Sequence, residues 1–225
     1  MQAIRIDSIG ITHLGLMRTN NEDVWAELPE EQFYILADGM GGHNAGEIAA
    51  RETVFHLIQS IKMMPKGSLT QVASYLNRAI QDASAWVYNL SLQNTPYQGM
   101  GTTLCCVLIY ENHLIYAHVG DSRIYRYRQG LSKLTVDHSL SKHVISRAIG
   151  TSRDVEPEIS IASIHPDDLY LLCSDGLTDY MSDHEIGSWL KQPYTLDRTA
   201  HALVEGALIR GGKDNITLML VKVAS

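Results

Sequence analysis

The sequence predicts an α+β fold with mainly antiparallel sheets. Between residues 102 and 135, four apolar runs of β character are separated by short turns, and turns this short demand antiparallel neighbours. Two amphipathic helical stretches precede these runs, and further helices and a last strand follow them. Strands and helices thus come in blocks, whereas a parallel sheet would alternate single strands with single helices.

The composition is that of a globular chain. Its 225 residues are 45% hydrophobic and 19% charged, which suits one domain spanning residues 1–225. A net charge of −7 without any basic run argues against a nucleic-acid partner. No apolar stretch reaches the ~18 residues of a membrane span, and the amino-terminal segment lacks the apolar region of a secretory signal. Three cysteines without a spaced framework indicate free thiols. We therefore expect a cytoplasmic protein without membrane association, and a monomer, since no heptad pattern suggests assembly.

The amino-terminal half is predicted to hold strands at residues 4–12 and within 23–37, followed by two helices. Asn44 and Glu47 resemble a capping box at the start of the first helix. Apolar residues then recur at helical spacing: Ala50, Val54, Leu57, Ile58 and Ile61. The second helix follows Ser68, and its apolar stripe is typical of core packing.

The carboxy-terminal half is predicted to be richer in strands. They are expected at residues 102–110, 113–119, 122–128, 131–135, 158–164, 168–174 and 216–223. A short helix is expected within 138–150. Ser182 and Glu185 form a second predicted capping box, and apolar spacing around Ala200 to Leu208 predicts the last helix.

Four aspartates stand at the ends of apolar strand-like runs. Asp38 and Asp175 each end such a run and precede a glycine, which lets the backbone turn sharply and leaves its carbonyl accessible. Asp121 follows another run, and Asp214 precedes the last one. A single aspartate of this kind usually caps a turn, but several brought together cost energy unless a cation compensates them. Oxygen ligands suit magnesium, manganese or calcium, and a pair of such ions can activate water for attack on phosphorus. Phosphoester hydrolysis is the chemistry that these residues favour.

Six short motifs together resemble the metal-dependent type 2C protein serine/threonine phosphatases, most closely the bacterial branch. In the order of that family, they are Arg18-Thr19-Asn20-Asn21-Glu22-Asp23, Asp38-Gly39-Met40-Gly41-Gly42-His43, Gly99-Met100-Gly101-Thr102-Thr103, Gly120-Asp121-Ser122-Arg123, Ser174-Asp175-Gly176-Leu177 and Gly212-Lys213-Asp214-Asn215. The resemblance implies a four-layer α-β-β-α sandwich, in which helices flank two packed antiparallel sheets and the metal centre lies at one end. It also implies phosphoprotein substrates, the products of a serine/threonine kinase.

The resemblance implies a cofactor of two Mn²⁺ or Mg²⁺ ions and a set of ligands for them. Asp38 would bridge the two ions, with the carbonyl of Gly39 on the second. Asp175 and Asp214 would complete the protein ligands of the first ion. Asp121, together with Asp175, would hold a third, weaker metal.

Three further residues receive roles from the same resemblance. Glu22 and Asp23 match positions that orient metal-bound waters, and Arg18 matches the clamp for the substrate phosphate, a role that suits a forked guanidinium. The implied reaction is direct attack on phosphorus by a hydroxide that bridges the two metals, without a phosphoenzyme.

The sequence departs from the family pattern at two places. Met40 stands where many eukaryotic members have a histidine that protonates the leaving group, so the general acid is unassigned; His43 or a water is an alternative. The flap of bacterial relatives is also reduced to a short segment, residues 140–146. We expect a more open site with weaker discrimination among peptides.

The sequence also bears on other classes of function. No cysteine has an arginine six residues on, which excludes the cysteine-dependent phosphatases. Ser174 lies at a strand-to-turn step like a hydrolase nucleophile, but Leu172 replaces the first glycine of that motif. Residues 206–213 fail as a phosphate-binding P-loop because the helix precedes the strand. Two alternatives remain open: a two-metal phosphoesterase acting on small molecules, and a non-catalytic module that binds phosphoproteins.

Overall fold

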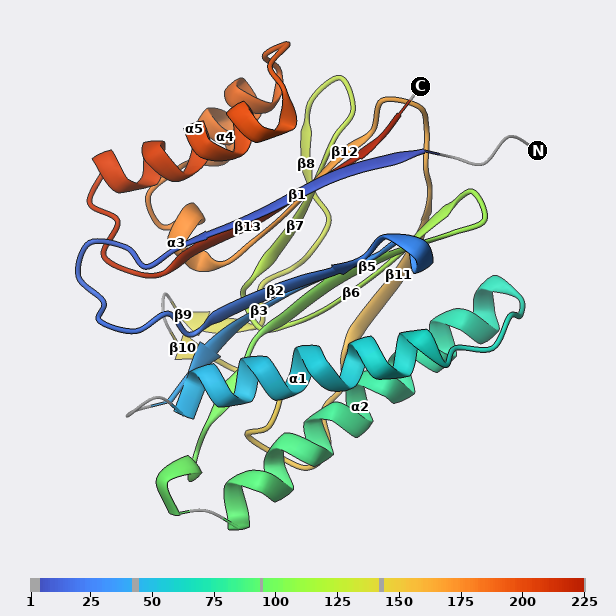
Figure 1. Cartoon of the computed structure of the whole chain (residues 1–225), viewed down its shortest axis with the longest axis vertical. Helices are drawn as coiled ribbons and strands as arrows, with labels where there is room; N and C mark the ends of the chain where they lie inside the picture. The colour runs from blue at the N-terminus through green and yellow to red at the C-terminus, as the bar shows by residue number, and fades with distance from the viewer. Residues whose placement is uncertain (1–4, 42–44, 94, 142–143, 225) are drawn as a thin grey trace.

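Four layers of secondary structure, in the order helix, sheet, sheet and helix, are stacked in this protein (Figure 1). The structure is a computed structural model that describes residues 5–41, 45–93, 95–141 and 144–224. The predicted α+β sandwich with two antiparallel sheets is confirmed.

The two central layers are antiparallel sheets. The first consists, in spatial order, of β1 (Ile6–His13), β13 (Ile216–Val223), β12 (Leu169–Cys173), β7 (Arg123–Tyr127) and β8 (Leu131–Lys133). The second consists of β11 (Glu158–Ser163), β6 (His113–Val119), β5 (Leu104–Tyr110), β3 (Phe33–Met40) and β2 (Asp23–Leu28), with β4 (Gly101–Thr102) against the end of β3. The first and last strands of the chain are therefore neighbours in one sheet.

Helices cover the outer face of each sheet (Figure 1). The second sheet is covered by α1 (Ala45–Lys62) and α2 (Leu69–Gln93), and the first by α3 (Asp175–Thr178), α4 (Asp183–Leu190) and α5 (Leu196–Ile209). Short 3-10 turns occur at Pro29–Glu31 and Thr95–Tyr97. The predicted capping box of α4 is present, with Ser182 and Glu185 bonded reciprocally. Within the described residues, no helix combines the length and apolarity needed to cross a membrane.

Strands buried on both faces explain the continuous apolar runs of the sequence. All five residues of β12 are buried. Leu171 and Cys173 pack toward the helices, whereas Tyr170 and Leu172 pack toward the other sheet. Successive side chains of a strand point to opposite faces, so a strand between two layers needs apolar residues at every position.

The prediction of a short helix within residues 138–150 is wrong. This segment contains a small hairpin of β9 (Ser139–Ser141) and β10 (Val144–Ile145). Its backbone groups are taken by partners that exclude a helix: His138 N donates to Gly120 O (2.9 Å), and Ser146 N donates to His138 O (2.8 Å). The other predicted elements are present within a few residues of their expected bounds, although Asn44 of the first capping box lies outside the described residues.

Candidate metal centre

One cavity of about 640 Å³ at an end of the sandwich brings the predicted site residues together. Segments of both sheets meet there: the β1–β2, β6–β7 and α5–β13 loops, the end of β3, β10 and the start of α3 (Figure 1). The lining residues are Arg18, Glu22, Asp38, Gly39, Met40, Gly41, Asp121, Ile145, Asp175 and Asp214. Of the predicted site residues, only Asp23 is absent from the wall.

The backbone N–H and carbonyl of Asp38 fix this residue at the end of β3 by hydrogen bonds to Thr103. Its N–H donates to Thr103 Oγ1 (3.0 Å), and its carbonyl accepts from Thr103 N (2.8 Å). Thr103 Oγ1 also lies 2.7 Å from Ser122 Oγ, so the same threonine connects Asp38 with the loop that carries Asp121. Gly39 follows, and a side chain there would collide with the backbone at the start of α1. Glycine is needed because helix and strand approach so closely.

Asp23 lies behind the cavity wall and is buried. It faces Asp38 in the β2–β3 register, and Ser174 Oγ donates to its Oδ2 (2.9 Å). Its Oδ1 has no hydrogen-bond partner among the described residues. Burial raises the pKa of Asp23 to about 6, against the opposing effect of hydrogen bonds from Thr217 and Ser174. Ser174 is itself fully buried and bonded to Asp23, which rules it out as a nucleophile.

Asn215 joins the loops around the cavity, and sequence reasoning gave it no role. Its Oδ1 accepts from Glu22 N (2.8 Å), and its Nδ2 donates to the carbonyls of Leu14 (2.9 Å) and Asn20 (3.0 Å). Its own N–H donates to Asp214 Oδ1 (2.8 Å). Asn215 thereby connects Asp214, through its backbone N–H, with the loop that carries Glu22, through its side-chain amide. Its place beside Asp214 in the last motif was the only hint in the sequence.

Arg18 and Asp214 form an ion pair at the mouth of the cavity. Arg18 Nη2 donates to Asp214 Oδ2 at 2.8 Å, and both side chains keep substantial solvent exposure. This hydrogen bond raises the pKa of Arg18 above its ordinary value. The pair holds the guanidinium over the cavity.

The cavity concentrates negative charge. Burial, followed by repulsion from Asp23, Asp175, Asp214 and Asp121, raises the pKa of Asp38 well above its ordinary value. The pKa of Asp175 is raised to about 7 by burial first and then by Asp121 and Asp214. Burial likewise raises the pKa of Glu22 and of Asp121. Among the described residues, five carboxylates and one guanidinium line this wall, so oxygen-binding cations of charge +2 fit the donor set and would relieve the repulsion.

The metal-free protein is expected to lose stability as the pH rises. The folded-state pKa values of Asp175 (about 7) and Asp23 (about 6) exceed the ordinary value of 3.8. Between these values the folded state binds more protons than the unfolded state, so the free energy of unfolding falls with rising pH. At this chain length a change of about 1 kcal/mol in the free energy of unfolding shifts the melting temperature by roughly 2–4 °C. In a chelator we expect the melting temperature to fall by at least that amount from about pH 5 to about pH 8; a rise would contradict the repulsion described above.

An α-β-β-α sandwich with a carboxylate cavity at one end has the features of a metal-dependent hydrolase of phosphate esters. Comparison with known proteins gives the same class. The sequence profile of the family Protein phosphatase 2C matches residues 17–205. The serine/threonine phosphatase stp of Listeria monocytogenes serotype 4b is 32% identical, over 94% of this chain and 93% of that protein. Protein phosphatase PhpP of Streptococcus pneumoniae serotype 2 is 33% identical, over 95% and 96%.

Solved structures agree with these relatives. Serine/threonine phosphatase Stp1 from Staphylococcus aureus superposes with a TM-score of 0.92 at 30% identity, covering 98% of this chain and 96% of that one. The catalytic domain of the phosphatase PstP, in complex with two manganese ions, superposes with a TM-score of 0.89 at 33% identity, covering 98% and 99%. The chain belongs to the protein phosphatase 2C family. It is a metal-dependent serine/threonine protein phosphatase, as the resemblance implied.

Proposed function

We propose that the carboxylate cavity is the catalytic metal centre and that it holds two Mn²⁺ or Mg²⁺ ions. Asp38 would bridge them, the Gly39 carbonyl would bind the second, and Asp175 and Asp214 would bind the first. The observation that carries this proposal is the convergence of five carboxylates, each from a separate part of the described chain, on one cavity wall. The solved relative with two manganese ions supports the number and type of ion.

The proposed mechanism follows from the positions of these residues. When bound, the cations supply a water of lowered pKa and polarise the phosphoryl oxygens. The guanidinium of Arg18 binds two phosphate oxygens and orients phosphorus toward the carboxylate wall. Glu22 on the wall and Asp23 behind it accept hydrogen bonds from waters and so direct the nucleophile. Met40 lines the cavity and cannot transfer a proton, and His43 lies outside the described residues. We propose water as the proton donor to the leaving alkoxide, with His43 as the alternative.

A substrate panel tests this function. Phosphoserine and phosphothreonine peptides, nucleotides and an aryl phosphate should be assayed with Mn²⁺. We expect turnover of the peptides, and absence of peptide turnover with rapid nucleotide hydrolysis would favour the small-molecule alternative. Binding of phosphopeptides without any hydrolysis would favour the non-catalytic alternative.

Arg18→Ala is expected to weaken phosphate binding. The loss of a charge-assisted, forked contact of about 1.5–3 kcal/mol corresponds to a KM roughly 10- to 100-fold higher. The effect on kcat should be smaller, and Arg18→Lys should recover part of the affinity, because it restores the charge without the fork. Steady-state kinetics on one phosphopeptide measure both constants. An unchanged KM in Arg18→Ala would contradict the role of Arg18 as clamp.

We further propose phosphoproteins made by a serine/threonine kinase as the substrates, with residues 1–225 acting as one catalytic domain and as a monomer. The β1–β13 pairing of distant segments supports one domain. Three buried free cysteines support a reducing, cytoplasmic location.

A further inference from the structure

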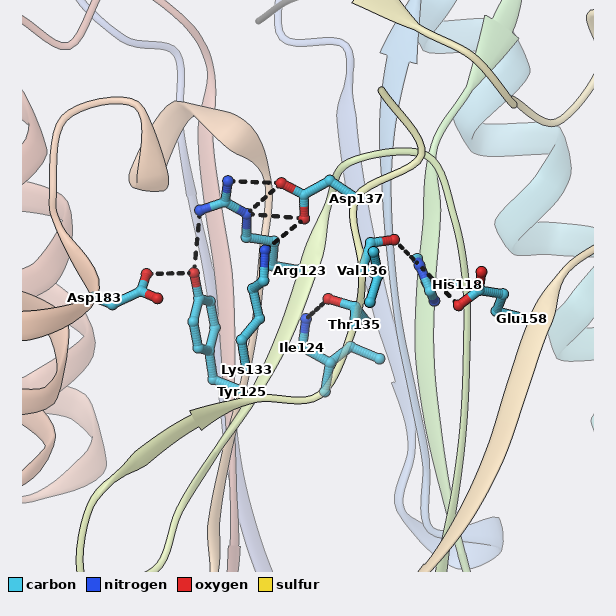
Figure 2. A network of polar contacts seen from close by, with 10 residues as sticks. All are labelled: His118, Arg123, Ile124, Tyr125, Lys133, Thr135, Val136, Asp137, Glu158 and Asp183. Carbon is cyan, nitrogen blue, oxygen red and sulfur yellow. Dashed lines mark hydrogen bonds and ion pairs between the residues drawn. The ribbon is translucent and has the colours of Figure 1, made fainter. Parts of the chain in front are cut away.

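The segment of residues 134–138, which we call the strap, runs beside the loop that carries Asp121. At one end it is joined to β7: Leu134 N donates to Ile124 O (2.8 Å), and Ile124 N donates to Thr135 Oγ1 (3.2 Å). Asp137 then accepts a forked contact from Arg123, with distances of 2.7 Å from Nη2 to Oδ2 and 3.1 Å from Nε to Oδ1 (Figure 2). Residue 123, two positions after Asp121, is thereby held.

The other end of the strap holds the residue just before Asp121. His138 N donates to Gly120 O (2.9 Å), and Gly120 N donates to His138 Nδ1 (3.2 Å). Gly120 has φ of +100°, and a side chain there would collide with Thr103. Asp121 therefore lies between two clamped residues, Gly120 and Arg123, and both clamps belong to the strap.

The ring of His138 is fixed by a second histidine and a glutamate. It is buried and stacks on His118 with a centroid distance of 4.5 Å. Its Nε2 lies 3.2 Å from Glu158 Oε1 and 3.3 Å from Arg147 Nη1, which donates to Glu156 O at 2.8 Å. His118 Nε2 donates to Val136 O (2.8 Å), a contact back to the strap (Figure 2).

These hydrogen bonds argue against a metal ion at the two histidines. Because Nδ1 of His138 accepts from a backbone N–H, its neutral ring carries the proton on Nε2, facing Glu158. Nε2 of His118 must also be protonated to donate to a carbonyl. An ion would have to displace both arrangements, so this trio is better explained as a brace.

We propose that the strap, with His138 as its positioning residue, orients Asp121 and thereby sets the affinity of the third metal site in this short-flap enzyme. The inference rests on the proposed metal centre. A ligand held in advance loses less conformational freedom on binding, and residues that orient a ligand contribute to metal affinity as the ligands do. The strap would perform this function although the flap is reduced to a hairpin.

Two variants of His138 separate positioning from bulk. His138→Asn places an amide oxygen close to the position of Nδ1 and can accept from Gly120 N–H, whereas His138→Gln places its amide near Nε2. The exposed His201 of α5 provides the matched control, His201→Gln. Mn²⁺ binding should be titrated by calorimetry, and melting temperatures should be measured to show that each variant is folded.

We expect His138→Gln to weaken the weakest Mn²⁺ site about 10- to 100-fold while the two tighter sites are unchanged. His138→Asn and His201→Gln should bind as the wild type does. If His138→Gln bound all three Mn²⁺ ions as tightly as the wild type does, the role of the strap would be overturned and the phosphatase centre would be left intact. A wild type with only two Mn²⁺ sites would overturn the third site and this inference together, and a wild type without any Mn²⁺ binding would overturn the metal centre itself. Zn²⁺ binding that disappears in both His138 variants would show that the brace is a metal site.

Discussion

Asp38→Asn is expected to abolish turnover and to raise the melting temperature of the metal-free protein. Asparagine keeps the size of the side chain but cannot bridge two cations as a carboxylate does. If the metal ions lower the activation barrier by several kcal/mol, the loss of this effect lowers kcat by roughly 10³-fold or more. Asp38→Ala should be equally inactive, and its backbone contacts with Thr103 predict that the fold is retained.

The gain in stability has a separate cause. In the metal-free state, burial and four neighbouring carboxylates raise the pKa of Asp38, so its ionised form is unfavourable there. A neutral amide removes this repulsion, and each kcal/mol recovered corresponds to roughly 2–4 °C. Thermal unfolding in a chelator near neutral pH measures the change.

The control for this experiment is Asp167→Asn. Asp167 is exposed in the β11–β12 turn with φ of +66°, a conformation that asparagine also tolerates. Neither activity nor melting temperature should change in the control. If Asp38→Asn lowered the melting temperature of the metal-free protein, the carboxylate cluster would not be repulsive as described.

Removing divalent ions is the second change with a large expected effect. A chelator should stop turnover, and Mn²⁺ or Mg²⁺ should restore it. Since cations bind the folded state and not the unfolded chain, Mn²⁺ at 100 times its dissociation constant should add about 2.7 kcal/mol. That corresponds to a rise in melting temperature of roughly 5–10 °C.

The rise in melting temperature caused by Mn²⁺ should also depend on pH in a definite direction. Protons compete with cations for Asp175, whose pKa in the metal-free state is about 7, so the rise should be larger at about pH 8 than at about pH 6. Asp38→Asn should reduce the rise strongly, because it removes the proposed bridging ligand. No shift at millimolar Mn²⁺ would mean that this cavity does not bind cations.

Metal binding should also affect the arginine at the cavity mouth. Arg18 is paired with Asp214, the same carboxylate that the proposed first metal would use. A cation on Asp214 weakens the hold of this carboxylate on the guanidinium by competing for its charge.

Much of this protein could be predicted from its sequence because the relevant forces are local. The stripe from Leu69 to Leu90 defines α2, Ser182 and Glu185 cap α4, and the run 216–223 coincides with β13. The aspartates at the strand ends could likewise be recognised, since a charged residue next to an apolar run is a local feature of the sequence.

Contacts between distant segments were decided only in the tertiary structure. The pattern Leu171, Leu172, Cys173 does not say which side chain faces the helices and which the other sheet, because both faces are apolar. Strands β9 and β10 replace the helix predicted within 138–150, and the backbone N–H of His138 just before them donates to Gly120, eighteen positions earlier. Asn215 and Ser174 gain their roles from partners more than 150 residues away, Glu22 and Asp23. Such bonds form only after the chain has closed these loops, and no local preference encodes them.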